Sequence, residues 1–277
     1  MKIMMTKNRQ IHHPSFKSRT REILLHSKFV FPLALPFLHY AISTTTTTTA
    51  KALNLALISG STRTTGPPTV LGPRVSSFIL HSLQIRGHTV THIDPKNHDF
   101  PLLEKPHFAY PPGRTPENLQ RVHEILNNAD GYVCVTPEYN HSPSPALINI
   151  LNHFGSSVFS FKPSAIVSYS AGQWGGTRAA VGLRTTLSEL GCLPVSAMIH
   201  IPKAQDVFDK DGNIIVLEAN EDGGDDGNNV ESAENAENQW QKYCGRCFSQ
   251  LEWWADAAKR HKEFVDPFDD SGQRNAP

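Results

Sequence analysis

Residues 53–66 of the chain read LNLALISGSTRTTG, a short apolar run followed by small and hydroxyl-bearing residues. The run at 53–59 predicts a buried β-strand that Gly60 ends. Ser61 and Arg63 follow just before a predicted helix, whose first main-chain N–H groups favour an anion. An ordinary turn rich in Ser, Thr and Gly explains the loop equally well. Neither G-x-G-x-x-G nor G-x-x-x-x-G-K is present, so a single phosphate monoester fits better than a dinucleotide or a nucleoside triphosphate.

Beyond this stretch, short apolar strands alternate with helices. Strands are expected at 88–94, 131–136, 164–170 and 194–201, and helices at 75–86, 115–128, 144–154 and 177–190. Thr115 and Pro116 predict a capped helix start, and the proline-rich residues 95–114 predict a loop. Five short strands in this alternation predict an α/β fold with a parallel sheet covered on both faces. Ligands of such sheets bind beyond the carboxyl ends of the strands.

Composition excludes several classes of protein. The 277 residues are 39% hydrophobic and 19% charged, which excludes a chain that is disordered throughout. No apolar run reaches the length of a membrane-spanning helix, so no integral membrane span is expected. Residues 51–277 carry 19 basic and 25 acidic residues, and this acidic balance argues against a nucleic-acid partner. Four cysteines fit a reducing compartment better than a disulfide scaffold.

The chain is expected to contain one globular domain with extensions. Residues 1–52 form a basic, Thr-rich extension, which is interpreted as a transit peptide, a disordered segment without function, or a secretory or anchor signal. Residues 53–217 form the domain and 218–239 an acidic linker. A helix at 240–264 packs on the domain through Trp240, Tyr243, Phe248, Leu251 and Trp254, and residues 265–277 form a disordered tail. The predicted location is the cytoplasm, or an organelle if residues 1–50 act as a transit peptide.

Three motifs stand at the ends of predicted strands. The first is Gly60-Ser61-Thr62-Arg63, and the second is Pro137-Glu138-Tyr139-Asn140 with a P-x-L-x-N helix start at 145–149. The third, residues 168–179, reads SYSAGQWGGTRA. Together, over residues 53–205, they resemble the NADPH-dependent FMN reductase family. The resemblance implies a flavodoxin-like three-layer sandwich with a five-stranded parallel sheet in the order 2-1-3-4-5.

The same resemblance implies the site residues. Ser61 and Arg63 match the positions that hold the FMN phosphate. Pro137, Glu138, Tyr139 and Asn140 match the loop along the ribityl chain and the flavin ring. The second flavin loop corresponds to Ala171, Gly172, Gln173, Trp174, Gly175 and Gly176, where main-chain N–H groups approach the ring oxygens. No catalytic side chain and no metal are expected, because the flavin carries the chemistry.

The implied activity is that of an FMN-dependent oxidoreductase. Hydride passes from NADPH, or from NADH, through flavin N5 to a quinone, an azo compound, a flavin or another small acceptor. The alternatives are a flavodoxin-like electron carrier and a degenerate flavin-binding module without reductase activity. A homodimer or homotetramer is expected, because flavin sites of this family are often completed across a subunit interface.

Other features receive structural interpretations. Two departures from the family pattern are a longer first loop, with an extra segment at 66–71, and the bulky Trp174, which could crowd the flavin. Cys244 and Cys247 have C-x-x-C spacing, but they lie within a helical stripe without a second pair and are interpreted as incidental. Histidines beside strands, namely His88, His92 and His200, are interpreted as structural.

Overall fold

A computed structural model describes residues 52–98, 100–215 and 233–269, which all belong to one compact unit spanning Thr48–Pro277. Residues 1–51 of the predicted extension, 218–232 of the predicted linker and 270–277 of the predicted tail lie outside the described residues. No helix among the described residues is long and apolar enough to cross a membrane.

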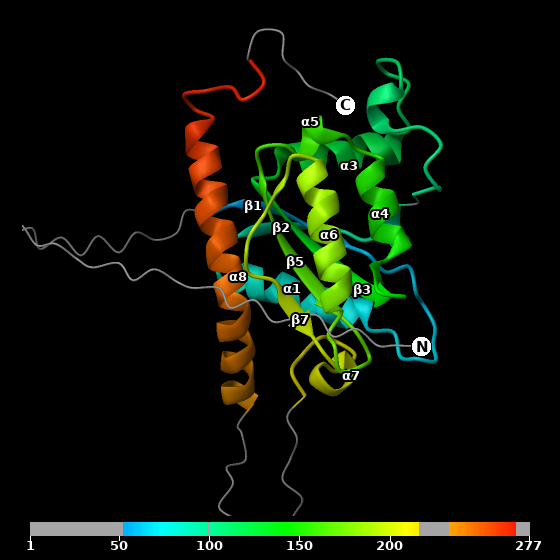
Figure 1. The fold of residues 1–277 in the computed structure, drawn as a ribbon, viewed down its shortest axis with the longest axis vertical. Helices are drawn as coiled ribbons and strands as arrows, with labels where there is room; N and C mark the ends of the chain where they lie inside the picture. Colours follow the sequence, from blue (N-terminus) through cyan, green and yellow to red (C-terminus); the bar gives the residue numbers. More distant parts are fainter. Residues whose placement is uncertain (1–51, 99, 216–232, 270–277) are drawn as a thin grey trace, which may run out of the picture. The chain divides into compact units, whose positions relative to one another are not determined.

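A parallel sheet forms the middle layer (Figure 1). Its strands follow the order β2 (Thr89–Ile93), β1 (Asn54–Ser59), β3 (Gly131–Tyr139) and β5 (Pro163–Tyr169), and β6 (Leu193–Pro194) and β7 (Ile199–Ile201) both pair with β5. This confirms the predicted order, with the fifth strand split in two. The split occurs where Arg184 donates hydrogen bonds to the carbonyl oxygens of residues 194, 195 and 196, at 2.8 to 3.1 Å, and so diverts them from the sheet.

Helices cover both faces of the sheet and enclose two cores. One face is covered by α1 (Gly72–Ile85) and α8 (Ala233–His261), which bury residues such as Leu55, Val133 and Val167. The other is covered by α3 (Glu117–Asn128), α4 (Pro145–Asn152), the short α5 (Ser156–Phe159) and α6 (Thr177–Glu189). Figure 1 shows α6 and α8 on either side of the strands. The fold is therefore a flavodoxin-like three-layer sandwich.

Several element boundaries differ from the prediction. The residues 95–114 contain two single turns, α2 (Pro95–His98) and a 3₁₀ turn at His107–Ala109. Helix α3 begins at Glu117, after Pro116, without a side-chain cap, so the predicted cap at Thr115 is wrong. Strand β3 continues to Tyr139 because it forms a hairpin with β4 (Ser142–Pro143). A further short helix, α7 (Ala204–Val207), follows β7.

The C-terminal helix packs along the domain as a core element. It begins at Ala233, seven residues before the predicted start. The predicted inward residues Phe248 and Leu251 are buried, but Tyr243 and Trp254 are each 44% exposed. Cys244, Cys247 and Ala255 complete the buried face instead. Spacings of three and four residues put these five buried side chains on one side of the helix, whereas Tyr243 and Trp254 fall at its margins.

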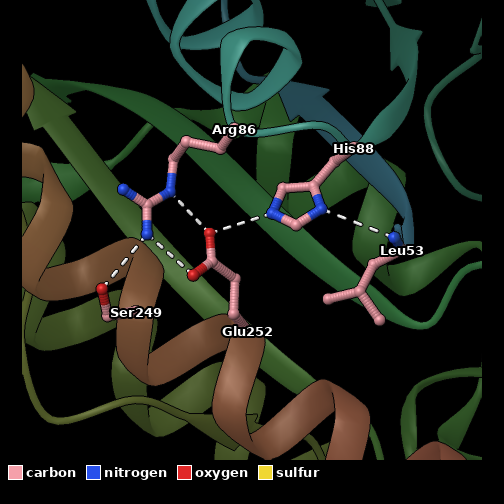
Figure 2. A network of polar contacts seen from close by, with 5 residues as sticks. All are labelled: Leu53, Arg86, His88, Ser249 and Glu252. Atoms are coloured by element: carbon pink, nitrogen blue, oxygen red, sulfur yellow. Dashed lines mark hydrogen bonds and ion pairs between the residues drawn. The ribbon is translucent and has the colours of Figure 1, made fainter. Parts of the chain in front are cut away.

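A polar network joins α8 to the amino-terminal half of the sheet (Figure 2). The carboxylate of Glu252 accepts hydrogen bonds from Nε and Nη2 of Arg86, at 2.5 and 2.7 Å. His88 lies 2.9 Å from the same carboxylate, and its Nδ1 accepts a 3.4 Å bond from the main-chain N–H of Leu53. Since Nδ1 accepts, Nε2 carries the proton and donates to Glu252. His88 thus has the structural position predicted for it.

Candidate functional site

A pocket of about 210 Å³ opens where the carboxyl ends of β1, β3 and β5 meet the first turn of α1. This is the edge of the sheet at which the fold predicts a ligand. Residues from three segments line the pocket: Ser61, Arg63, Pro68, Thr69, Leu71, Gly72, Pro137, Glu138, Tyr139, Tyr169, Ser170 and Ala171.

The floor of the pocket has the properties of an anion cradle. Helix α1 starts at Gly72 without a side-chain cap, so the main-chain N–H groups of Gly72 and Arg74 have no side-chain acceptor, and Pro73 between them has no N–H. A Cβ at Gly72 would lie 2.8 Å from Ser61 Cβ and 2.9 Å from the Tyr169 hydroxyl, so only glycine fits there. Burial raises the pKa of Tyr169, although its hydrogen bond to Ser61 opposes the rise, so the hydroxyl stays protonated. Two main-chain donors at the helix start and two hydroxyls therefore lie close together around Gly72.

Arg63 folds its own loop over this cradle. Its Nη2 donates to the carbonyl oxygens of Thr65, at 3.2 Å, and of Pro68. These bonds hold the extra segment at 66–71 against the pocket, where Pro68, Thr69 and Leu71 form a wall. The guanidinium keeps its Nε and Nη1 donors, which make no hydrogen bond to the described part of the chain. Arg63 therefore both orders the longer loop and offers positive charge to the pocket.

Glu138 lies near the end of β3, and its side chain caps the first turn of α6. Its carboxylate accepts from Arg178 Nε at 2.8 Å and from the main-chain N–H groups of Arg178 and Ala179 at 3.2 and 3.4 Å. Burial alone would raise the pKa of Glu138, but these bonds outweigh it and lower the pKa. The carboxylate thus caps a helix N-terminus and stays ionised.

The hairpin after β3 turns tightly at Asn140 and His141, with φ of 50° and 64°. Both residues occupy the left-handed region, as a two-residue hairpin turn of this twist requires, and asparagine tolerates it better than most. The turn leaves Asn140 exposed outside the pocket lining. Tyr139, 37% exposed, stands at the rim.

The loop at 171–176 presents main-chain donors on one side and packs on the other. Within the described residues, the N–H groups of 171–174 make no hydrogen bond to the protein. A Cβ at Gly172 would meet open space, whereas one at Gly176, where φ is 77°, would lie 2.9 Å from Ser168 Cβ. Gly175 and Gly176 therefore serve the turn itself. Trp174 is 61% exposed and lies under Arg178, whose Cζ is 5.9 Å from the ring centroid, outside the pocket lining.

The family model described as NADPH-dependent FMN reductase matches residues 53–206. The chain belongs to this family. The match includes all three motifs on which the resemblance rested. A probable NADPH:quinone oxidoreductase of Oryza sativa subsp. japonica is 31% identical over 186 residues, which are 63% of this chain and 85% of the relative.

Bacterial relatives match shorter stretches. An NAD(P)H-dependent FMN reductase of Pseudomonas aeruginosa is 36% identical over 110 residues, 38% of this chain and 60% of the relative. The chain spans 40–63% of the length of three bacterial relatives. These are the Pseudomonas aeruginosa reductase, an NADPH azoreductase of Bacillus and a quinone reductase of Pseudomonas putida. The flavoenzyme FerB of Paracoccus denitrificans has the same fold, with a TM-score of 0.51 at 17% identity over 76% of this chain and 99% of that chain.

This pocket gathers half of the residues named from the sequence. Ser61, Arg63, Pro137, Glu138, Tyr139 and Ala171 line it, while Asn140, Gly172, Gln173, Trp174, Gly175 and Gly176 do not. Sequence reasoning missed Tyr169, Ser170, Gly72 and the wall at 68–71. Tyr169 and Ser170 belong to the third motif. Their position at the carboxyl end of a predicted strand could have indicated that they line the pocket. No sequence pattern showed that the extra segment folds back on the pocket.

The other candidate groups are held by the protein. His92 Nε2 is 2.6 Å from Ser59 Oγ, and His200 Nδ1 is 2.8 Å from Ser168 Oγ, as expected of structural histidines. Burial raises the pKa of both Cys244 and Cys247 to about 12, so these thiols are protonated in the core. Among the described residues, no group of three or more His, Cys, Asp or Glu side chains is placed to hold a metal ion.

Proposed function

We propose that this protein is an FMN-dependent NAD(P)H oxidoreductase that reduces a small acceptor. The observation that carries the proposal is the anion cradle at the carboxyl edge of the sheet, formed by Ser61, Arg63 and the uncapped start of α1. Family membership and the names of the relatives, which include FMN, quinone and azo reductases, support it.

The residues present fit FMN. The phosphate would lie on the cradle formed by Ser61, Arg63 and the start of α1. The free N–H groups of 171–174 would donate to the polar edge of the ring, and Tyr139 would border it. When bound, FMN supplies the two-electron chemistry by taking a hydride from a nicotinamide and passing it to an acceptor. The chain binds and orients the reactants, and Glu138 holds the loops in place.

The acceptor would enter beside the flavin pocket. A more open pocket of about 520 Å³ shares Pro68, Thr69, Leu71 and Ala171 with it and adds Gly66, Pro67 and Gln205. Walls of proline and leucine suit a flat, apolar acceptor. We therefore favour a quinone or an azo compound over free flavin.

The test is an absorbance spectrum of the purified protein after incubation with FMN and desalting, followed by NADPH without oxygen. Retained yellow colour that NADPH bleaches, and that a quinone restores, is expected. Colour that NADPH leaves unbleached would identify an electron carrier instead. Protein that neither retains nor titrates FMN would identify a degenerate module.

Arg63→Ala is expected to weaken FMN binding by roughly 10- to 100-fold, because a charge-assisted hydrogen bond contributes about 1.5–3 kcal/mol. Arg63→Lys keeps the charge and is expected to restore part of the affinity. The control is Arg121→Ala, which removes an exposed arginine on α3. Fluorescence titration of FMN measures all three, and an unchanged dissociation constant for Arg63→Ala would place the phosphate elsewhere.

We also propose that the protein assembles into a homo-oligomer and works in a reducing compartment. The exposed aromatic rings of Tyr139 and Trp174 beside the site support a homodimer or homotetramer that completes it. Light scattering after size-exclusion chromatography measures this, and a monomer with full activity would contradict it. Four unpaired cysteines, all buried, support the cytoplasm or another reducing compartment.

A further inference from the structure

A second pocket, of about 330 Å³, lies at the opposite end of β5 from the flavin pocket. It opens between the start of β5 at Pro163, the start of β6 at Leu193 and the end of α8. The flavin pocket touches the other end of the same strand, at Tyr169. The volume of the second pocket falls within the range of small-molecule sites, about 300–1,000 Å³.

Exposed apolar side chains form the walls of this amino-end pocket. Phe161, Leu193, Trp254 and Val265 all line it, and each is between 44% and 52% exposed. They come from separate parts of the chain: Phe161 precedes β5, Leu193 starts β6, Trp254 belongs to α8 and Val265 follows α8. Large side chains from separate elements that converge and stay half exposed provide contact area for a ligand.

Phe161 is held in an unfavourable backbone conformation at this pocket. Its φ is 61°, in the left-handed region that a bulky residue rarely adopts. Its main-chain N–H donates to the carbonyl oxygen of Gly191, at 3.2 Å, and its ring meets Phe268 edge to face at 5.3 Å. Such strain persists where the surroundings enforce it, and it concentrates at ligand sites. The position does not bury the ring, which is 52% exposed.

Two lysines, Lys162 and Lys262, line the pocket, and neither makes an ion pair within the described residues. Lys162 donates to the carbonyl oxygens of Leu126 and Asn127, at 3.0 and 2.8 Å, and so caps the end of α3. Lys259 pairs with Asp130 at 2.8 Å. Lys262, partly buried in the pocket wall, makes no ion pair within the described residues. Burial lowers the pKa of Lys262, while the charges of Asp130 and Asp266 oppose that effect.

We infer that the amino-end pocket binds a small apolar carboxylate, such as an aromatic acid. The carboxylate would pair with Lys262, and the hydrocarbon part would lie among Phe161, Leu193 and Trp254. An ammonium group in an apolar wall gains free energy from an anion that shares its desolvated surroundings. The last turn of α8 carries Lys259, Arg260 and His261, which offset the negative end of the helix dipole.

Calorimetry with 2-naphthoate and its neutral analogue 2-naphthalenemethanol tests this inference. The full chain is saturated with FMN first, so that the flavin pocket is occupied. Naphthoate is expected to bind more tightly than the alcohol. Lys262→Met is expected to weaken naphthoate by about tenfold or more while leaving the alcohol unchanged. Lys242→Met, on an exposed position of α8 outside the pocket lining, is the matched control.

A second variant tests the strained ring. Phe161→Gly relieves the left-handed strain, so it is expected to lose binding of both compounds without lowering the melting temperature. A lower melting temperature with binding retained would mean that Phe161 is structural. Equal affinity for naphthoate and the alcohol, or no effect of Lys262→Met, would also overturn the inference. Naphthoate that binds only when FMN is left out would place it in the flavin pocket.

Discussion

At Glu138, one carboxylate connects two loops of the proposed flavin pocket. It leaves the end of β3, lines the pocket, and accepts three hydrogen bonds from the start of α6. Its side chain is only 7% exposed, while that of its partner Arg178 is 43% exposed. A cap of this kind orders the loop that precedes α6. The positions of the free N–H groups of 171–174 therefore depend on Glu138.

Glu138→Gln is expected to lower the free energy of unfolding by about 1 kcal/mol near neutral pH, the usual contribution of a helix-capping side chain. The folded pKa of Glu138 is lowered, so its contribution is present above the ordinary glutamate pKa of about 4.3 and is lost as the pH falls through the folded value. Urea unfolding of both proteins over a range of pH measures this.

The wild type and Glu138→Gln are therefore expected to converge at acid pH. Glu189→Gln, on an exposed position near the other end of α6, is the matched control and should change stability little. A constant difference across the whole pH range would show that the charge of Glu138 is not what caps the helix.

At the scale of elements, α8 completes one of the two cores. Its buried face of Cys244, Cys247, Phe248, Leu251 and Ala255 covers the side of the sheet that α1 covers only in part. The contacts of Glu252 with Arg86 and His88 set its position along the domain (Figure 2). The helix therefore belongs to the domain although an acidic segment separates the two in sequence.

Glu252→Gln is expected to destabilise the protein by roughly 2 kcal/mol, because it weakens charge-assisted hydrogen bonds in a partly buried network. Burial opposes ionisation of Glu252, but the bonds from His88 and Arg86 lower its pKa overall. The loss is thus expected at neutral pH and should shrink as the pH falls through the lowered pKa.

Thermal unfolding at two pH values measures the effect, with the exposed Glu237→Gln on the same helix as control. Equal melting temperatures for Glu252→Gln and wild type at neutral pH would mean that the apolar face alone holds α8.

Over the whole molecule, the described domain encloses every cysteine of the chain. Cys134 and Cys192 lie in one core, and Cys244 and Cys247 in the other. Burial raises the pKa of all four thiols, to about 12 for Cys192, Cys244 and Cys247. Since the thiolate is the reactive form, none of them should react readily in the native protein.

An aromatic disulfide reagent is therefore expected to detect almost no thiol in the native protein at mildly alkaline pH, and four in guanidinium. Absorbance of the released thiolate counts them. Two thiols that react fast in the native protein, and that no longer react when Cys244 and Cys247 are replaced by serine, would identify these two cysteines as a redox pair instead of core residues.

The sequence by itself determined the alternation of strands and helices, the parallel sheet with both faces covered and the edge of the sheet that carries the candidate site. These follow from local patterns, because each apolar run and each helical spacing fits only one kind of element. The strand order was implied by the family resemblance. The motifs at 60–63, 137–140 and 168–179 were likewise local, and the family they indicated is confirmed.

Tertiary structure decided which side chains point into the pocket. Gly175 and Gly176 are predicted to border the flavin, and close contacts with Ser168 and Ile201 already require glycine at both positions. Glu138 acts on a helix 40 residues away, and Phe161, Leu193 and Lys262 meet only through folding. Such contacts depend on where distant segments are brought together, and no periodicity along the chain records that.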